Sequence, residues 1–417
     1  MNRIAPILLD WYARSGRDLP WRRTRDPYRI WLSEVILQQT RVGQGLGYYL
    51  RFTERFPDVC SLAAASEDEI LKLWQGLGYY SRARNLHAAA REVVGRFGGE
   101  FPAEPDALRS LPGVGDYTAA AVASMAFGLP YAVLDGNVFR VLARLFDVEV
   151  PVDTGAGRRI CVELAQSLLD TERPGTYNQA LMDFGALLCT PAQPRCGECP
   201  LAGCCLALAA GTVALRPVKQ GRTKVRERWF HYLHISCEGR TLLCRRAGRD
   251  IWQGLYEFPL LETEGPADFP ALAARPDFRE LLGDAEWRLV GTVVMPRHQL
   301  SHQTIHATVY RIETPRCLRR PLRWRSIPPR WAIMPCRGCW SVTCWNTTVE
   351  KAAGRPAQTD SFPLPVGQGA GRCGEDGCLL SERVGSGAFS FPVSSPDGKL
   401  LSRVLALRNA RMFGYFR

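Results

Sequence analysis

The fold of this chain is decided around residues 111–127, LPGVGDYTAAAVASMAF. Gly113 and Gly115 flank Val114, and glycine lets the backbone turn at positive φ without steric cost. The alanine-rich run that follows predicts a helix able to pack closely against its neighbours. Because N–H groups at the start of a helix attract anions, the stretch predicts a phosphate cradle. Taken alone, such a turn is more often a plain connection between helices, and it lacks the Lys-Ser/Thr of a nucleotide-triphosphate loop.

The regions around this stretch indicate more than one domain, as a length of 417 residues also does. Residues 1–210 are predicted to be mainly helical, with Gly and Pro between the helices. Residues 211–228 are rich in Lys and Arg and poor in apolar side chains, which suits a basic linker. Residues 229–316 hold short β-branched and aromatic runs, which predict the strands of a small α+β domain.

The last part of the chain, residues 317–417, has no periodic pattern of helices or strands. A disordered tail is one interpretation, but Trp and Cys are dense here for disorder. The segment WAIMPCRGCWSVTCWN, residues 331–346, can be encoded by codons that spell GDYAVPRLLERYLLE when read two nucleotides later. We therefore interpret the irregular tail as the product of a frameshift and assign it no function.

The net charge of +12 is weak evidence for a nucleic-acid partner, because most of it lies in that tail. Residues 318–417 hold 15 Lys and Arg against 6 acids, whereas residues 1–225 hold 26 against 23. No apolar run is long enough to cross a membrane, and the start of the chain does not read as a secretory signal. We expect a cytoplasmic protein without a membrane partner, in which the fifteen cysteines do not form a disulfide framework.

Four of those cysteines are spaced as metal ligands within residues 189–205. They are Cys189, Cys196, Cys199 and Cys205, separated by six, two and five residues. Thiolates at this density suit a [4Fe–4S] cluster or a structural zinc, and four unrelated buried cysteines are improbable. Cys204 adjoins the fourth cysteine and is an alternative ligand.

Two carboxylates are candidates for acid–base chemistry. Glu34, in IWLSEVILQQT, has no basic side chain at its helical neighbours and either lies on a narrow polar stripe or faces a pocket. Burial would raise its pKa toward the value that a general acid needs near neutrality. Asp135, in AVLDGNVFRVLARLF, precedes a predicted helix and by itself reads as an N-cap.

Planar side chains accompany these carboxylates in turns that we expect to be exposed. Gln38 and Gln39 form one such group, and Tyr79 and Tyr80 form another. Groups of this kind can enter a base stack when a nucleotide is extruded. Trp21, Trp31 and Trp74 are instead expected in the core.

Together and in this order, these motifs resemble the helix-hairpin-helix DNA glycosylases, and most closely the adenine DNA glycosylase (MutY) family. The resemblance covers residues 6 to about 310 and rests on LPWRRTRDPYRIWLSEVILQQTRV, LWQGLGYYSRARNLH, LPGVGDYTAAA, LDGNVFRVLAR, NQALMDFGALLCTPAQPRC and CPLAGCC. It implies a mainly α glycosylase domain in which the four cysteines hold a [4Fe–4S] cluster. It further implies that Gly113 and Gly115 grip a DNA phosphate.

The resemblance also implies roles for the site residues in removing adenine opposite 8-oxoguanine or guanine. Glu34 would protonate the adenine and later assist water, and Asp135 would stabilise the cationic sugar, since such bond cleavage needs two carboxylates in different protonation states. The remaining carried-over positions are Tyr117 and Asn137 in the pocket, Trp21 and Arg22 near the adenine, and Gln39 and Tyr79 at the vacated stack.

The residue at position 117 distinguishes this chain from the related endonuclease III group, which is the nearest alternative. That group has a Lys there, which attacks the sugar and leads to strand cleavage, whereas this chain has Tyr117. A monofunctional glycosylase is therefore favoured. Phe139 replaces a Lys that some adenine glycosylases carry.

The second domain resembles the Nudix-like domain by which this family recognises 8-oxoguanine. Ser301 and His302, in RHQLSHQTIHATVYRI, match the Ser-His pair of the recognition loop. We find no Glu-rich metal box, so this domain is expected to bind and not to hydrolyse. The expectation is a monomeric, bacterial, nucleoid-associated enzyme, with an endonuclease III-like glycosylase/lyase or a non-catalytic iron–sulfur DNA-binding protein as the alternatives.

Overall fold

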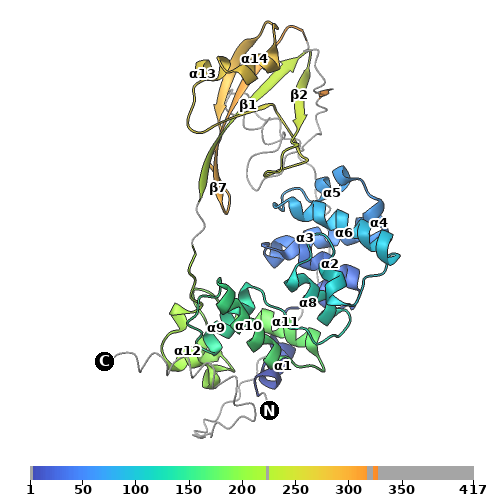
Figure 1. Cartoon of the computed structure of the whole chain (residues 1–417), viewed down its shortest axis with the longest axis vertical. Coiled ribbons are helices and arrows are strands. Elements are labelled where there is room, and N and C mark those ends of the chain that lie inside the picture. The colour runs from blue at the N-terminus through green and yellow to red at the C-terminus, as the bar shows by residue number, and fades with distance from the viewer. Residues whose placement is uncertain (1–2, 222–224, 317–322, 327–417) are drawn as a thin grey trace, which may run out of the picture. The chain divides into compact units, whose positions relative to one another are not determined.

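The structure, a computed structural model, describes residues 3–221, 225–316 and 323–326. These residues form a helical part followed by a part built on a β-sheet (Figure 1). Of the irregular tail expected at residues 317–417, only residues 323–326 are described; residues 317–322 and 327–417 lie outside the described residues. In the described residues, no helix has both the length and the apolar character that a membrane crossing requires.

The helical part confirms the expectation of a mainly helical first domain. Its α-helices are α1 (Ile4–Ser15), α2 (Pro27–Leu37), α3 (Val42–Arg55), α4 (Val59–Ala64), α5 (Glu67–Leu73), α6 (Ser81–Phe97), α7 (Pro105–Arg109), α8 (Asp116–Met125), α9 (Gly136–Leu145), α10 (Gly155–Leu168), α11 (Pro174–Leu187) and α12 (Leu206–Ala209). Four short 3₁₀ turns complete it: η1 (Pro20–Arg22), η2 (Cys196–Glu198), η3 (Ala202–Cys204) and η4 (Val213–Leu215).

Helix α2 is the central element of the helical part. Asp26 caps its N-terminus by accepting a hydrogen bond from the N–H of Tyr28, and Pro27 occupies the first turn, where no backbone donor is needed. It packs against α3, α6 and α8, so its side chains are buried on nearly all sides. Trp21, Trp31 and Trp74 are all buried in the surrounding core, as predicted.

The second part is a sheet of eight strands in the described residues. They are β1 (Arg226–Cys237), β2 (Arg240–Arg245), β3 (Tyr256–Glu257), β4 (Leu260–Thr263), β5 (Arg288–Val294), β6 (His298–Gln299), β7 (Gln303–Glu313) and β8 (Arg323–Ser326). The main strand order is β3-β2-β1-β7-β5, and β1 and β7 pair in parallel from Arg226↔Gln303 to Ser236↔Glu313. Helices α13 (Phe269–Ala273) and α14 (Pro276–Leu282) cover one face of the sheet (Figure 1).

Both boundaries of this sheet differ from the expected range of 229–316. Strand β1 begins at Arg226, inside the expected linker, and β8 pairs with β2 beyond residue 316. At the start of β1, three charged residues in a row, Arg226 to Arg228, hide the alternating pattern on which the expectation relied. Part of the expected linker also lies against the helical part, because the carboxylate of Asp153 accepts hydrogen bonds from the N–H groups of Gln220 and Gly221, both at 2.9 Å.

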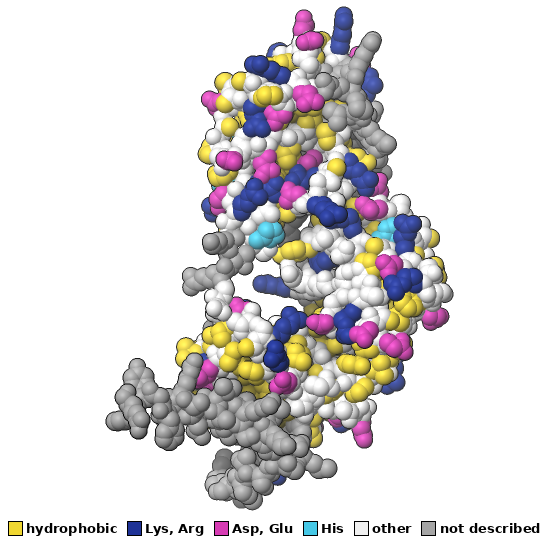
Figure 2. Space-filling view, viewed as in Figure 1, with side chains coloured by type: hydrophobic (Ala, Val, Ile, Leu, Met, Phe, Trp, Pro, Cys, Tyr) yellow, Lys and Arg dark blue, Asp and Glu magenta, His cyan; other side chains and the backbone are white. Residues whose placement is uncertain are grey.

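The distribution of surface charges is consistent with the net charge being weak evidence for a nucleic-acid partner. On the face in Figure 2, basic and acidic side chains of the described residues are interspersed and do not gather in one basic area. The net charge therefore does not locate a nucleic-acid site on this face.

Candidate active site and cysteine cavity

Glu34 lies in α2 and is 5% exposed. Burial is the main cause that raises its pKa, to about 7, and the negative charge of Asp135 adds to the rise. The hydrogen bond from Tyr117 and the positive charge of Arg22 oppose it. The carboxyl group can therefore hold or release a proton near neutral pH.

Tyr117 lies in the first turn of α8, which packs against α2. Its hydroxyl donates a hydrogen bond to Oε2 of Glu34, with 2.6 Å between the two oxygens. Burial and the charge of Glu34 raise the pKa of Tyr117 well above its usual value. The phenol thus stays protonated and serves as a fixed donor to Glu34.

Asp135 is the N-cap of α9, so the simpler interpretation of this residue is confirmed. Its Oδ1 accepts a hydrogen bond from the N–H of Val138 and its Oδ2 accepts one from the side-chain amide of Asn137, both at 2.7 Å. Burial raises the pKa of Asp135, while these two hydrogen bonds oppose the rise. The cap does not exclude a second role, because the charge of this carboxylate acts on Glu34.

A chain of hydrogen bonds continues from Asp135 toward the cysteines. The guanidinium of Arg140 donates to Oδ1 of Asn137 at 2.9 Å and to the carbonyl of Cys189 at 2.8 Å. Gly185 permits the close approach of α11 to α9 here, because a Cβ on it would lie 2.7 Å from that of Asn137. The position of the second carboxylate is therefore coupled to the loop that starts at Cys189.

Arg22 is held beside this site by Asp183, a side chain that is fully buried in α11. Both terminal nitrogens of Arg22 donate to the carboxylate of Asp183, at 2.5 and 2.7 Å. Arg17 binds the same carboxylate through its side chain and through its backbone N–H, the latter at 2.9 Å. Two arginines around one acid compensate for the cost of burying its charge.

The glycine turn lies directly before α8, as predicted, but only one of its two glycines has the positive φ that we expected. Gly113 has φ of 76°, and a Cβ on it would lie 2.7 Å from Cβ of Asn85. Gly115 is extended, with φ of −99° and ψ of −176°, so the expectation of positive φ is wrong for that residue. As the N-cap of α8 it has no side chain to bind the first N–H groups, which stay available to an anion.

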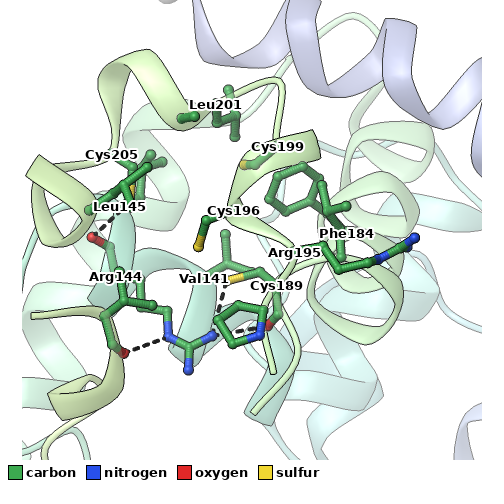
Figure 3. Close-up of a pocket in the computed structure, with 15 residues that line it drawn as sticks. Val141, Arg144, Leu145, Phe184, Cys189, Arg195, Cys196, Cys199, Leu201 and Cys205 are labelled. Atoms are coloured by element: carbon green, nitrogen blue, oxygen red, sulfur yellow. Dashed lines mark hydrogen bonds between the residues drawn. The ribbon is translucent and has the colours of Figure 1, made fainter. Parts of the chain in front are cut away.

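The four predicted cysteine ligands line one cavity, shown in Figure 3. Including its open mouth, the cavity encloses about 440 Å³, and its other lining residues are mostly apolar, among them Val141, Leu145, Phe184 and Leu201. Among the described residues, no three His, Cys, Asp or Glu side chains converge as ligands of a single metal ion. Arg144, which is buried, donates to Sγ of Cys189 at 3.4 Å and to the carbonyl of Thr190 at 2.7 Å.

Comparison with known proteins identifies both parts of the chain. Residues 32–156 match the family described as "HhH-GPD superfamily base excision DNA repair protein", and residues 231–331 match the NUDIX domain. The adenine DNA glycosylase of Buchnera aphidicola subsp. Schizaphis graminum is 33% identical over 262 residues, which are 63% of this chain and 76% of that protein. This chain belongs to the adenine DNA glycosylase family.

Other members of the adenine DNA glycosylase family match different shares of the chain. The human protein is 46% identical over 209 residues, or 48% of this chain, and the Schizosaccharomyces pombe protein is 36% identical over 322 residues, or 63% of this chain. The chain spans only about 38–41% of the length of the human, rat and mouse relatives. A solved structure titled "Structure of a thermostable thymine-DNA glycosylase" is 33% identical and covers 49% of this chain and 95% of its own, with a TM-score of 0.47.

In this family member, the structure groups the site residues that the sequence predicted. Glu34, Tyr117, Asp135 and Asn137 are brought together, with Arg22 beside them. Gln39 and Tyr79 are exposed as expected, whereas Tyr80 is buried in the core and Gln38 is half-buried, so the expectation of exposure is wrong for Tyr80. Trp21 is buried against Tyr49. Ser301 and His302 belong to the turn between β6 and β7, where Oγ of Ser301 lies 3.0 Å from Nδ1 of His302.

Sequence reasoning missed the side chains that support this site. Asp183, Arg140 and Arg144 bond to groups that lie far away in the sequence. One signal was present: Asp183 is an acid in the apolar run LMDFGALL, where burial demands a basic partner.

Proposed function

We propose that this protein is an adenine DNA glycosylase that removes adenine mispaired with 8-oxoguanine or guanine by hydrolysing the N-glycosidic bond. The observation that carries the proposal is the buried Glu34, with its pKa raised to about 7, hydrogen-bonded by Tyr117 and acted on by Asp135. A carboxylic acid in this environment can donate a proton at neutral pH.

The two carboxylates take different parts in the proposed reaction. Burial raises the pKa of both carboxylates. Asp135 accepts hydrogen bonds on both oxygens, which oppose that rise and favour its charged form, whereas Glu34 accepts one, from Tyr117. Glu34 protonates the adenine ring and so makes it a better leaving group, and Asp135 stabilises the positive charge that develops on the deoxyribose. Glu34, now a carboxylate, then assists the attack of water on the sugar.

The environment of Tyr117 supports a monofunctional glycosylase. A glycosylase that also cleaves the strand through an amine needs a nucleophile beside the sugar. The phenol of Tyr117 instead keeps its proton and donates a hydrogen bond to Glu34. Borohydride treatment during the reaction should therefore trap no covalent adduct, and a trapped adduct would favour the endonuclease III-like alternative.

The proposed DNA contacts come from both parts of the chain. The uncapped N-terminus of α8 after Gly113 and Gly115 would bind a phosphate. Gln39 and Tyr79 would fill or flank the gap that the extruded nucleotide leaves. The exposed Ser301 and His302 would contact the base opposite the adenine.

We also propose that Cys189, Cys196, Cys199 and Cys205 hold a [4Fe–4S] cluster. Four thiols line one largely apolar cavity, which suits the [4Fe–4S] cluster that the family resemblance implies. Arg144 would place a hydrogen-bond donor and a positive charge beside Sγ of Cys189. A bound cluster would cross-link the cysteine loop and stabilise its fold.

The experiment that tests the function is excision from a synthetic duplex with one adenine opposite 8-oxoguanine. We expect an alkali-labile abasic site in the adenine strand, a weaker yield opposite thymine, and loss of product in Glu34→Gln with DNA binding retained. Absence of adenine release by folded, iron-loaded wild-type protein would refute the proposal.

A further inference from the structure

Arg82, in the first turn of α6, is buried although it carries a charge. Its Nη1 donates to the carbonyl of Val35 at 3.0 Å, of Ile36 at 2.9 Å and of Gln38 at 2.6 Å. Its Nη2 donates to the carbonyl of Gly78 at 3.2 Å and to Oγ1 of Thr40 at 3.3 Å. One guanidinium thus joins two separate turns.

The first of these turns follows α2, the helix that carries Glu34. The last carbonyls of a helix have no partners within it, and a cation is favoured at that end. Arg82 supplies both the donors and the charge, at Val35 and Ile36 within the helix and at Gln38 just after it. The side chain therefore fixes the path by which the chain leaves α2.

Each of the two turns presents an exposed residue in a strained backbone conformation. Gln39 has φ of 53° and Tyr79 has φ of 49°, in the left-handed region that side chains other than glycine rarely adopt. Tyr79 is 44% exposed, and Gln39 is exposed too. Such conformations persist only where surrounding contacts hold them, and they gather at functional sites.

Arg82 also touches one of these residues directly. Its guanidinium carbon lies 5.6 Å from the ring centre of Tyr79 and 5.1 Å from that of the buried Trp74. Burial lowers the pKa of Arg82 to about 10, so the group is still charged at neutral pH. Lysine keeps the positive charge, but its single ammonium group cannot donate hydrogen bonds to both turns, and it has no planar group to stack on an aromatic ring.

We infer that Arg82 is a positioning residue that holds Gln39 and Tyr79 in the pose from which they enter the base stack. The inference rests on the proposed function, because it assumes that an adenine is extruded. Its consequence is specific: loss of Arg82 slows extrusion of the base and spares the chemistry at Glu34.

The test compares Arg82→Lys with wild type on two duplexes that both pair adenine with 8-oxoguanine. In the first, the flanking pairs are intact; in the second, mismatches flank the adenine, so that it is already unstacked. We expect the single-turnover rate of Arg82→Lys to fall at least about tenfold on the first duplex and less than about threefold on the second. In a Glu34→Gln background, 2-aminopurine at the target position should show a smaller rise in emission when Arg82 is replaced.

Arg216→Lys is the matched control, because Arg216 is equally buried but its side chain pairs with Asp147 and Glu149, which follow α9. Any loss in this variant should be the same on both duplexes. Should Arg82→Lys not fold, Thr40→Val removes one acceptor and should give a smaller loss on the first duplex alone. If wild type releases adenine normally and Arg82→Lys loses the same fraction of its rate on both duplexes, the role of Arg82 is overturned. If wild type releases no adenine from either duplex, the proposed function itself is overturned.

Discussion

Replacing Tyr117 by Phe should move the alkaline limb of the pH–rate profile. The hydroxyl of Tyr117 donates to Oε2 of Glu34 at 2.6 Å and lowers the pKa of that carboxyl, which burial raises to about 7. A hydrogen bond to a charged group contributes about 1.5–3 kcal/mol, and one pKa unit corresponds to about 1.4 kcal/mol. The variant should therefore raise the pKa of Glu34 by about 1 unit, since part of the bond persists with the neutral acid.

The assay is single-turnover release of adenine across the pH range around neutrality. Because the protonated form of Glu34 is the active one, the wild-type rate should fall as pH rises above about 7, and the Tyr117→Phe rate should fall about 1 unit later. Tyr28→Phe is the control, because its hydroxyl also makes a buried hydrogen bond, to the carbonyl of Phe56 at 2.8 Å, but does not touch Glu34. A limb that is unmoved, or that moves to lower pH, would refute the reasoning.

Three further variants test the buried charges and the cysteines. Folding raises the pKa of Glu34 from 4.5 to about 7, so the contribution of this residue to stability is fully present below pH 4.5 and is lost as pH rises through 7. In urea unfolding above pH 8, Glu34→Gln should therefore be more stable than wild type by about 3 kcal/mol. A difference in stability that does not depend on pH would contradict this. Asp183→Asn should cost about 3–5 kcal/mol, because two arginines lose a buried partner, and an unchanged melting temperature would contradict the structure. Cys199→Ser should lose bound iron and brown colour while Cys60→Ser, at an exposed cysteine away from the cavity, keeps both; equal iron in the two proteins would refute the ligand assignment.

The residues that act on the substrate could be predicted because each lies in a short local pattern. Glu34 is conspicuous as an acid without a helical partner, and Asp135 marks a helix start. Their mutual influence required the fold, since α2 and α9 are distant in the sequence. Their proximity to Tyr117 was implied by family resemblance, and periodicity alone did not predict it.

Apart from Asp183, the residues that hold the site in place could not be predicted from local sequence. Arg82 reaches carbonyls more than forty positions away, and carbonyl acceptors leave no trace in a residue pattern. The expectation for Gly115 failed because a glycine can serve an extended N-cap as well as a left-handed turn. Strand β8 was missed because four residues are too few to show alternation.

The central claim is that Glu34 is a buried acid that protonates adenine. The most direct measurement is the single-turnover release of adenine from a duplex with adenine opposite 8-oxoguanine, by wild type and by Glu34→Gln at equal occupancy of DNA. We predict release by wild type and a loss of at least about a hundredfold in the variant, whose bound fraction is unchanged. Equal release by the two proteins would contradict the claim.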